Sequence, residues 1–78
     1  MPGEAMLRVE NVRNEDALES VRDTLDLLGV DYEHVRSEPY DDRFPQTAYF
    51  YVPDRSAEEV ERTLALLSQE HGFDAEVL

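Results

Sequence analysis

Apolar and polar residues alternate in four short segments of the chain, and apolar residues recur every three or four positions in two longer segments. Alternation with a period of two predicts a strand with one buried face, whereas a period near 3.6 predicts a helix. The segments therefore predict the order strand, helix, strand, strand, helix, strand. The predicted strands are residues 7–12, 30–37, 47–52 and 73–78, and the predicted helices lie between the first two and the last two strands.

The first predicted helix has capping signals at both ends. Asn14 or Asp16 offers a side-chain oxygen to the free backbone amides of the first turn, and Gly29 suits the left-handed conformation that commonly ends a helix. The apolar residues of this helix fall on one stripe, which predicts that the stripe packs against the sheet. It consists of Ala17, Leu18, Val21, Leu25 and Leu28.

The second predicted helix begins in residues 56–59, "SAEE", which match a capping box with Ser56 at the N-cap. Gly72 is expected to end this helix in the same way that Gly29 ends the first one. Its inward stripe consists of Ala57, Val60, Leu64 and Leu67.

The second and third predicted strands follow each other without an intervening helix. The alternation of the second strand slips, which predicts a β-bulge near Glu33 and His34. The third strand alternates cleanly, with tyrosines on one face and apolar residues on the other. The tyrosines are Tyr49 and Tyr51, and the apolar residues are Ala48, Phe50 and Val52.

This order of elements in 78 residues predicts an α+β, ferredoxin-like fold, with a four-stranded antiparallel sheet and two helices on one face. The first and third strands are expected in the centre of the sheet, and the second and fourth at its edges. A chain of this length forms one core, so we expect a single domain over residues 1–78. Pairing with a second copy of the chain would add stability to so small a domain.

The charge of the chain is strongly negative. Nineteen acidic residues face seven basic ones, all of them arginine, and the formal net charge is −12. Such a charge repels nucleic-acid phosphates and anionic lipids, so we expect neither nucleic acid nor a membrane as a partner. Two interpretations of the charge stay open: an acidic surface that docks a basic protein partner, or adaptation to a salt-rich cytoplasm, which the absence of lysine favours.

The sequence also predicts where the protein is found. No apolar run approaches the roughly 20 residues of a membrane-spanning helix, and the first residues lack the basic and apolar regions of a signal peptide. We therefore expect a cytoplasmic protein.

Residues that commonly carry catalysis or bind metals are scarce. There is no cysteine, which excludes disulfides, thiolate metal sites and cysteine nucleophiles. His34 and His71 have no second histidine three or four residues away, so we expect a structural or solvated role for each rather than metal binding. Tyr49 and Tyr51 lie where RNA-recognition domains stack bases, but the negative charge argues against RNA. With no Ser-His-Asp or paired-carboxylate pattern either, the sequence predicts no enzyme activity, no metal and no cofactor.

Four segments together give the chain a family likeness. Residues 15–18 read "EDAL", residues 28–35 "LGVDYEHV", residues 36–39 "RSEP" and residues 49–52 "YFYV". In this order they resemble ACT domains, which are small amino-acid-sensing modules, and most closely the regulatory domain of prephenate dehydratase. That family has PGAL at the start of its first helix, a glycine at the end of that helix, then ESRP and an aromatic-rich third strand. The resemblance spans residues 7–67.

The resemblance implies a non-catalytic regulatory module that binds a small amino acid or related metabolite at a homodimer interface. Two departures bear on the ligand: Asp16 stands where the family has a glycine that lets backbone approach the amino acid, and "RSEP" exchanges the charged ends of ESRP. An interaction or assembly module without a small-molecule ligand stays open as the alternative. The implied ligand-binding residues are Asn14, Asp16, Ala17 and Leu18, together with Ser37, Glu38 and Pro39 from a neighbouring subunit.

Overall fold

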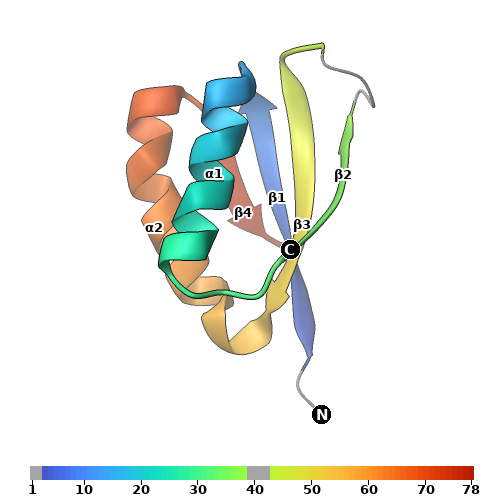
Figure 1. Cartoon of the computed structure of the whole chain (residues 1–78), viewed down its shortest axis with the longest axis vertical. Helices are drawn as coiled ribbons and strands as arrows, with labels where there is room; N and C mark the ends of the chain where they lie inside the picture. Colours follow the sequence, from blue (N-terminus) through green and yellow to red (C-terminus); the bar gives the residue numbers. More distant parts are fainter. Residues whose placement is uncertain (1–2, 39–42) are drawn as a thin grey trace.

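The computed structural model describes residues 3–38 and 43–78. Its four strands form one antiparallel sheet in the order β2-β3-β1-β4, and both helices cover one face of this sheet (Figure 1). This arrangement confirms the predicted α+β ferredoxin-like fold, with the first and third strands in the centre. The elements are β1 (Glu4–Val12), α1 (Glu15–Leu27), β2 (Glu33–Glu38), β3 (Gln46–Pro53), α2 (Asp54–His71) and β4 (Asp74–Val77).

The core lies between the helices and the covered face of the sheet. Alternate residues of β1 and β3 point into it, and the predicted stripes of both helices meet them there. The inward faces predicted from the sequence are therefore confirmed, although Leu28 and Leu67 are only partly buried. The buried apolar residues are Leu7, Val9, Val12, Ala17, Leu18, Val21, Leu25, Ala48, Phe50, Val52, Ala57, Val60, Leu64 and Phe73.

Helix α1 has the ends that the sequence predicts. Its N-cap is Asn14, whose side-chain oxygen accepts a hydrogen bond from the backbone N–H of Ala17 at 2.9 Å. After the C-cap, Gly29 adopts a φ of 70°, in the left-handed region that favours glycine.

Helix α2 begins earlier than the sequence predicts. Its first residue is Asp54 and its N-cap is Pro53, which makes no side-chain cap hydrogen bond, so the predicted cap at Ser56 is wrong. The backbone N–H of Asp54 instead donates to the carbonyl oxygen of Gly3 at 3.1 Å, which ties the first turn of α2 to the start of β1. The predicted end is confirmed, since Gly72 adopts a φ of 75°.

The strand boundaries also differ from the sequence prediction. Strand β1 starts at Glu4 because the end of β3 continues far enough to pair Pro53 with it. Strand β2 starts only at Glu33, and its bulge lies between His34 and Arg36, one residue later than predicted. The bulge turns Val35 outward, where 41% of its surface is exposed.

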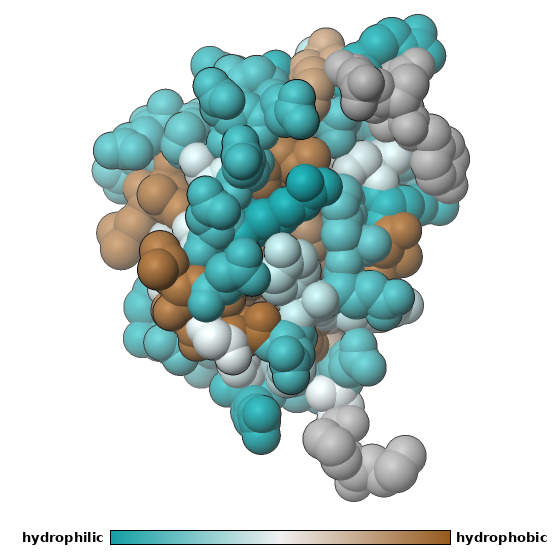
Figure 2. All heavy atoms as spheres, viewed as in Figure 1, coloured by the Kyte–Doolittle hydropathy of each residue, from teal (hydrophilic) through white to brown (hydrophobic). Residues whose placement is uncertain are grey.

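Hydrophilic residues cover most of the surface seen from this side, and apolar residues gather mainly over the two helices (Figure 2). The outer face of α1 is acidic. Its exposed carboxylates belong to Glu15, Asp16, Glu19, Asp23 and Asp26.

Candidate functional site

The structure brings the two segments that the sequence predicts for ligand binding to the same end of the sheet. Val12, just before α1, pairs with Gln46, and Glu38, the last residue of β2, pairs with Thr47. Both partners lie at the start of β3, so the start of α1 and the end of β2 flank this strand from its two sides (Figure 1).

Most side chains of the first predicted segment already have a structural role. The side chain of Asn14 caps α1, while Ala17 and Leu18 belong to the core and are only 1% and 7% exposed. Asp16 is exposed. A ligand at the start of α1 would therefore meet Asp16 and the cap, but neither apolar side chain.

The second predicted segment makes contacts within its own strand. Ser37 contacts His34, and Glu38 forms an ion pair with Arg36. Pro39 lies outside the described residues. Since the predicted site needs a neighbouring subunit, the ligand-binding role of these residues stays a prediction.

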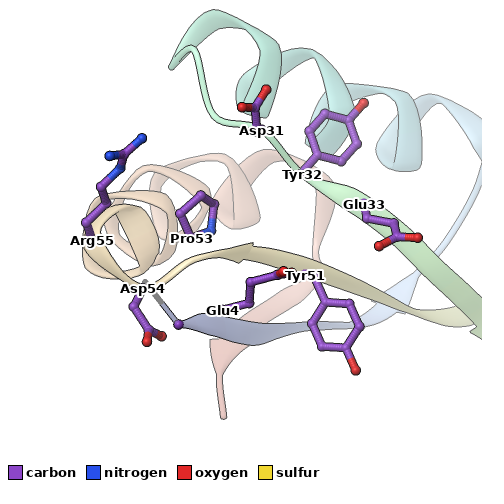
Figure 3. Close-up of a pocket in the computed structure, with 9 residues that line it drawn as sticks. Glu4, Asp31, Tyr32, Glu33, Tyr51, Pro53, Asp54 and Arg55 are labelled. Carbon is purple, nitrogen blue, oxygen red and sulfur yellow. The ribbon is translucent and has the colours of Figure 1, made fainter. Parts of the chain in front are cut away.

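A pocket lies at the opposite end of the sheet. At this end the last residues of β3 pair with β1 through Glu4 and with β2 through Glu33. The pocket has a volume of about 710 Å³ and is lined by residues 3–4, 31–33, 51 and 53–55 (Figure 3). None of the residues that the sequence predicts for ligand binding lines it.

The charged groups of the pocket are not neutralised by one another. Four carboxylates, those of Glu4, Asp31, Glu33 and Asp54, line it together with the guanidinium of Arg55. Arg55 and Asp54 lie on one side of the pocket and Glu33 lies on the other (Figure 3). Within residues 3–38 and 43–78 none of these five groups forms an ion pair, although arginines on the uncovered sheet face and on α2 pair with glutamates.

The walls of the pocket are fixed to the core. The Tyr32 ring packs edge-on against Phe50, with ring centroids 5.9 Å apart, and the backbone N–H of Val30 donates to the carbonyl oxygen of Leu25 at 3.1 Å. On the other side the Asp54 carboxylate packs against Gly3, where a side chain would displace it. The pocket is therefore preformed in the folded chain.

His34 links α1 to β2 through both of its ring nitrogens. Arg22 Nη2 lies 3.0 Å from His34 Nδ1, and His34 Nε2 lies 2.9 Å from Ser37 Oγ. A guanidinium only donates hydrogen bonds, so Nδ1 accepts, and Nε2 carries the proton and donates to Ser37. His34 in this tautomer cannot take a proton from the Ser37 hydroxyl, so the two do not form a nucleophile-base pair.

The surroundings of His34 favour its neutral form. The ring stacks on Phe50, with centroids 4.6 Å apart. Burial and, to a lesser extent, the charge of Arg22 lower the pKa of His34 below its usual value of 6.5, although a hydrogen bond to the Arg36 backbone opposes them. This structural role agrees with the one expected from the sequence.

Sequence reasoning did not single out the pocket. Its lining comes from three segments that are far apart in the chain, and no motif connects them. The one available signal was the tyrosine and two carboxylates of residues 31–33, which follow the glycine that ends the first helix. In the sequence they look like ordinary surface residues. Only the fold shows that they line one pocket together with Glu4 and Arg55.

No protein-family model, no curated protein and no solved structure matches the chain. The resemblance to ACT domains is therefore carried only by the residues quoted above. In the described part of the chain no helix is long and apolar enough to cross a membrane. The same residues contain no group of three or more histidine or acidic side chains placed to hold a metal ion.

Proposed function

We propose that this chain is a non-catalytic, ACT-like regulatory module that binds a small amino acid or related metabolite, and that the pocket at the end of β3 is its binding site. The observation that carries the proposal is the pocket itself. Its volume of about 710 Å³ lies within the range typical of small-molecule sites, roughly 300–1,000 Å³. Charged groups of both signs line it, and within the described residues they form no ion pairs with one another.

These charges suit a free amino acid. Such a ligand is a zwitterion, so its carboxylate can lie against Arg55 while its ammonium group lies against Glu33 or Asp31. Among the described residues the lining holds no serine, threonine, lysine or histidine, which are common nucleophiles and bases in enzymes. The lining residues therefore favour binding over catalysis.

We also propose that the module is a homodimer joined through the edge of β2. The two edges of the sheet differ, because on β4 the backbone N–H of Val77 donates to Glu61 Oε2 of α2 at 2.8 Å. Both edge strands pair on one side only, but β2 is the longer of the two, with 6 residues against 4 in β4. Sedimentation in high salt is expected to give a dimer, and a monomer would count against this part of the proposal.

A thermal-shift screen of the common amino acids tests the binding function. A ligand at 100 times its Kd stabilises a folded domain by about 2.7 kcal/mol, and a gain of 1 kcal/mol raises the Tm of a domain this small by roughly 4–8 °C. We expect Arg55→Gln to reduce the shift strongly and Arg62→Gln, the same change further along α2, to leave it unchanged. Equal melting temperatures with every amino acid would reject the function.

The acidic outer face of α1 favours a second candidate, an interaction or assembly module that docks a basic protein in a salt-adapted cytoplasm. Within the described residues none of these exposed carboxylates forms an ion pair, since Arg22, the arginine of the helix, is directed to His34. Attraction between exposed charges weakens as the Debye length falls to about 3 Å at 1 M salt. Pull-down at increasing salt is therefore expected to lose such a partner, and a partner retained in molar salt would exclude a charge-based docking surface.

A further inference from the structure

We infer that the ligand of the pocket carries a second cationic group, as L-arginine and L-lysine do. This inference rests on the proposed function and narrows its ligand class. Four carboxylates and one guanidinium line the pocket, and within the described residues they have no ion-pair partners. The two charges of a neutral amino acid neutralise Arg55 and a single carboxylate. A cationic side chain neutralises a further carboxylate, so the charge of the pocket favours it.

The tyrosines of the pocket lie beside these carboxylates. Tyr32 stands between Asp31 and Glu33 in the chain, and its ring is held in place by Phe50. Tyr51, whose side chain is partly exposed, pairs with Glu33 across β2 and β3. A cation next to Glu33 therefore has the Tyr51 ring as well as the carboxylate in reach, and tyrosine rings attract ammonium and guanidinium groups.

The positions of the charged residues in the pocket determine the orientation that we propose for the ligand. Arg55 lies at the start of α2, on the side away from Glu33 (Figure 3). We place the α-carboxylate of the ligand against Arg55 and its side-chain cation against Asp31 and Glu33, beside Tyr32. A cavity of about 710 Å³ has room for a long side chain such as that of arginine or lysine.

An organic cation fits this lining better than a metal ion does. A metal needs several oxygen ligands converging on one point, at roughly 2.0–2.6 Å for Mg²⁺ or Ca²⁺. The described carboxylates are instead spread around the pocket and form no such group. A guanidinium or ammonium group on a long chain can reach separate carboxylates at longer distances.

Calorimetric titration with matched ligand pairs tests the inference. L-citrulline has nearly the shape of L-arginine without its side-chain charge. L-norleucine is the corresponding uncharged analogue of L-lysine. At about 0.15 M KCl we expect each cationic ligand to bind roughly tenfold more tightly than its neutral counterpart. At about 1 M KCl, where the Debye length is about 3 Å, this ratio should shrink.

Substitutions in the pocket test whether its residues cause the preference for cationic over neutral ligands. Glu33→Gln and Asp31→Asn should each reduce the arginine-to-citrulline ratio about threefold to fivefold, as expected for a partly exposed ion pair. Arg55→Gln should weaken both ligands and leave the ratio unchanged. Glu59→Gln, an exposed charge change on α2 outside the pocket, should change nothing.

Each contrary outcome has a separate meaning. Equal affinity for arginine and citrulline would overturn the cationic ligand class while leaving the proposed amino-acid binding in place. Equal binding of Nα-acetyl-L-argininamide and free arginine would overturn the free amino acid as the ligand, because it would show that the α-carboxylate and α-amine contribute nothing. Absence of binding by all ligands, charged and neutral, would overturn the proposed function itself.

Discussion

His34 shows how a single residue gains its role from the fold. In the sequence it is an isolated histidine in a strand, whereas in the structure it stacks on Phe50 and joins Arg22 of α1 to Ser37 of β2. Because Arg22 donates to Nδ1, the ring carries its proton on Nε2. His34 therefore cannot act as a base toward Ser37. Side-chain spacing along the chain gave no indication of this contact, because Arg22 and His34 belong to different elements.

Lowering the pH is expected to destabilise the domain through His34. Its pKa is lower in the folded chain than the usual value of 6.5, so between these two values the unfolded chain binds more protons. The free energy of unfolding therefore falls as the pH drops below 6.5 and levels off below the folded pKa. Urea denaturation across this range should show that slope in the wild type.

The variant His34→Gln separates this effect from other titrations. It should flatten the slope, because the titrating group is gone. The same slope in wild type and His34→Gln would show that another group is responsible.

At the scale of elements, the two helix starts illustrate what local sequence does and does not determine. Asn14 caps α1 as its residue type predicts, because the adjacent strand ends just before it and leaves its side chain free to turn back. Ser56 has the same capping signal, but α2 starts at Asp54, where the chain is already bound to Gly3. A contact between distant segments therefore overrides the local motif.

Matched alanine substitutions measure this difference. Asn14→Ala should cost about 1 kcal/mol of stability, the usual cost of losing an N-cap hydrogen bond. Ser56→Ala should cost less than about 0.5 kcal/mol, because alanine is a better helix former and no cap is lost. Chemical denaturation of both variants gives the two values, and a larger loss for Ser56→Ala would contradict the observed start of α2.

The whole molecule combines a small core with a large negative charge. The order of the elements and the buried faces follow from apolar periodicity, since the same residues that form the pattern fill the core. The central and edge strands follow from the fold that this order of elements predicts. The pocket could not be predicted in this way. Nothing in the sequence distinguishes Glu4, Asp31 and Arg55 from other surface residues. They come to line one pocket only because β3 pairs with both of its neighbours.

Salt is expected to stabilise the domain, because it screens the repulsion among its carboxylates. The like charges of Glu19 and Asp23 are four residues apart on α1, and Asp26 lies on the next turn. The melting temperature should rise between about 0.1 M and 2 M KCl. A gain of 1 kcal/mol corresponds to roughly 4–8 °C for a domain of this size.

A variant with less charge serves as the control. The triple change Glu19→Gln, Asp23→Asn and Asp26→Asn should be more stable at low salt and gain less from added KCl. A salt response equal to that of the wild type would mean that charge repulsion on α1 does not limit stability.

The most direct measurement is an amide chemical-shift titration of the labelled protein by NMR, with L-arginine as the ligand. A ligand in the pocket and a ligand at the start of α1 would shift amide signals at opposite ends of the sheet. One spectrum therefore distinguishes the two sites. If the pocket is the binding site, the largest shifts fall on the amides of residues 3–4, 31–33, 51 and 54–55. Shifts confined to residues 14–18 and 37–38, at the other end of the sheet, would contradict this account and favour the site implied by the resemblance to ACT domains.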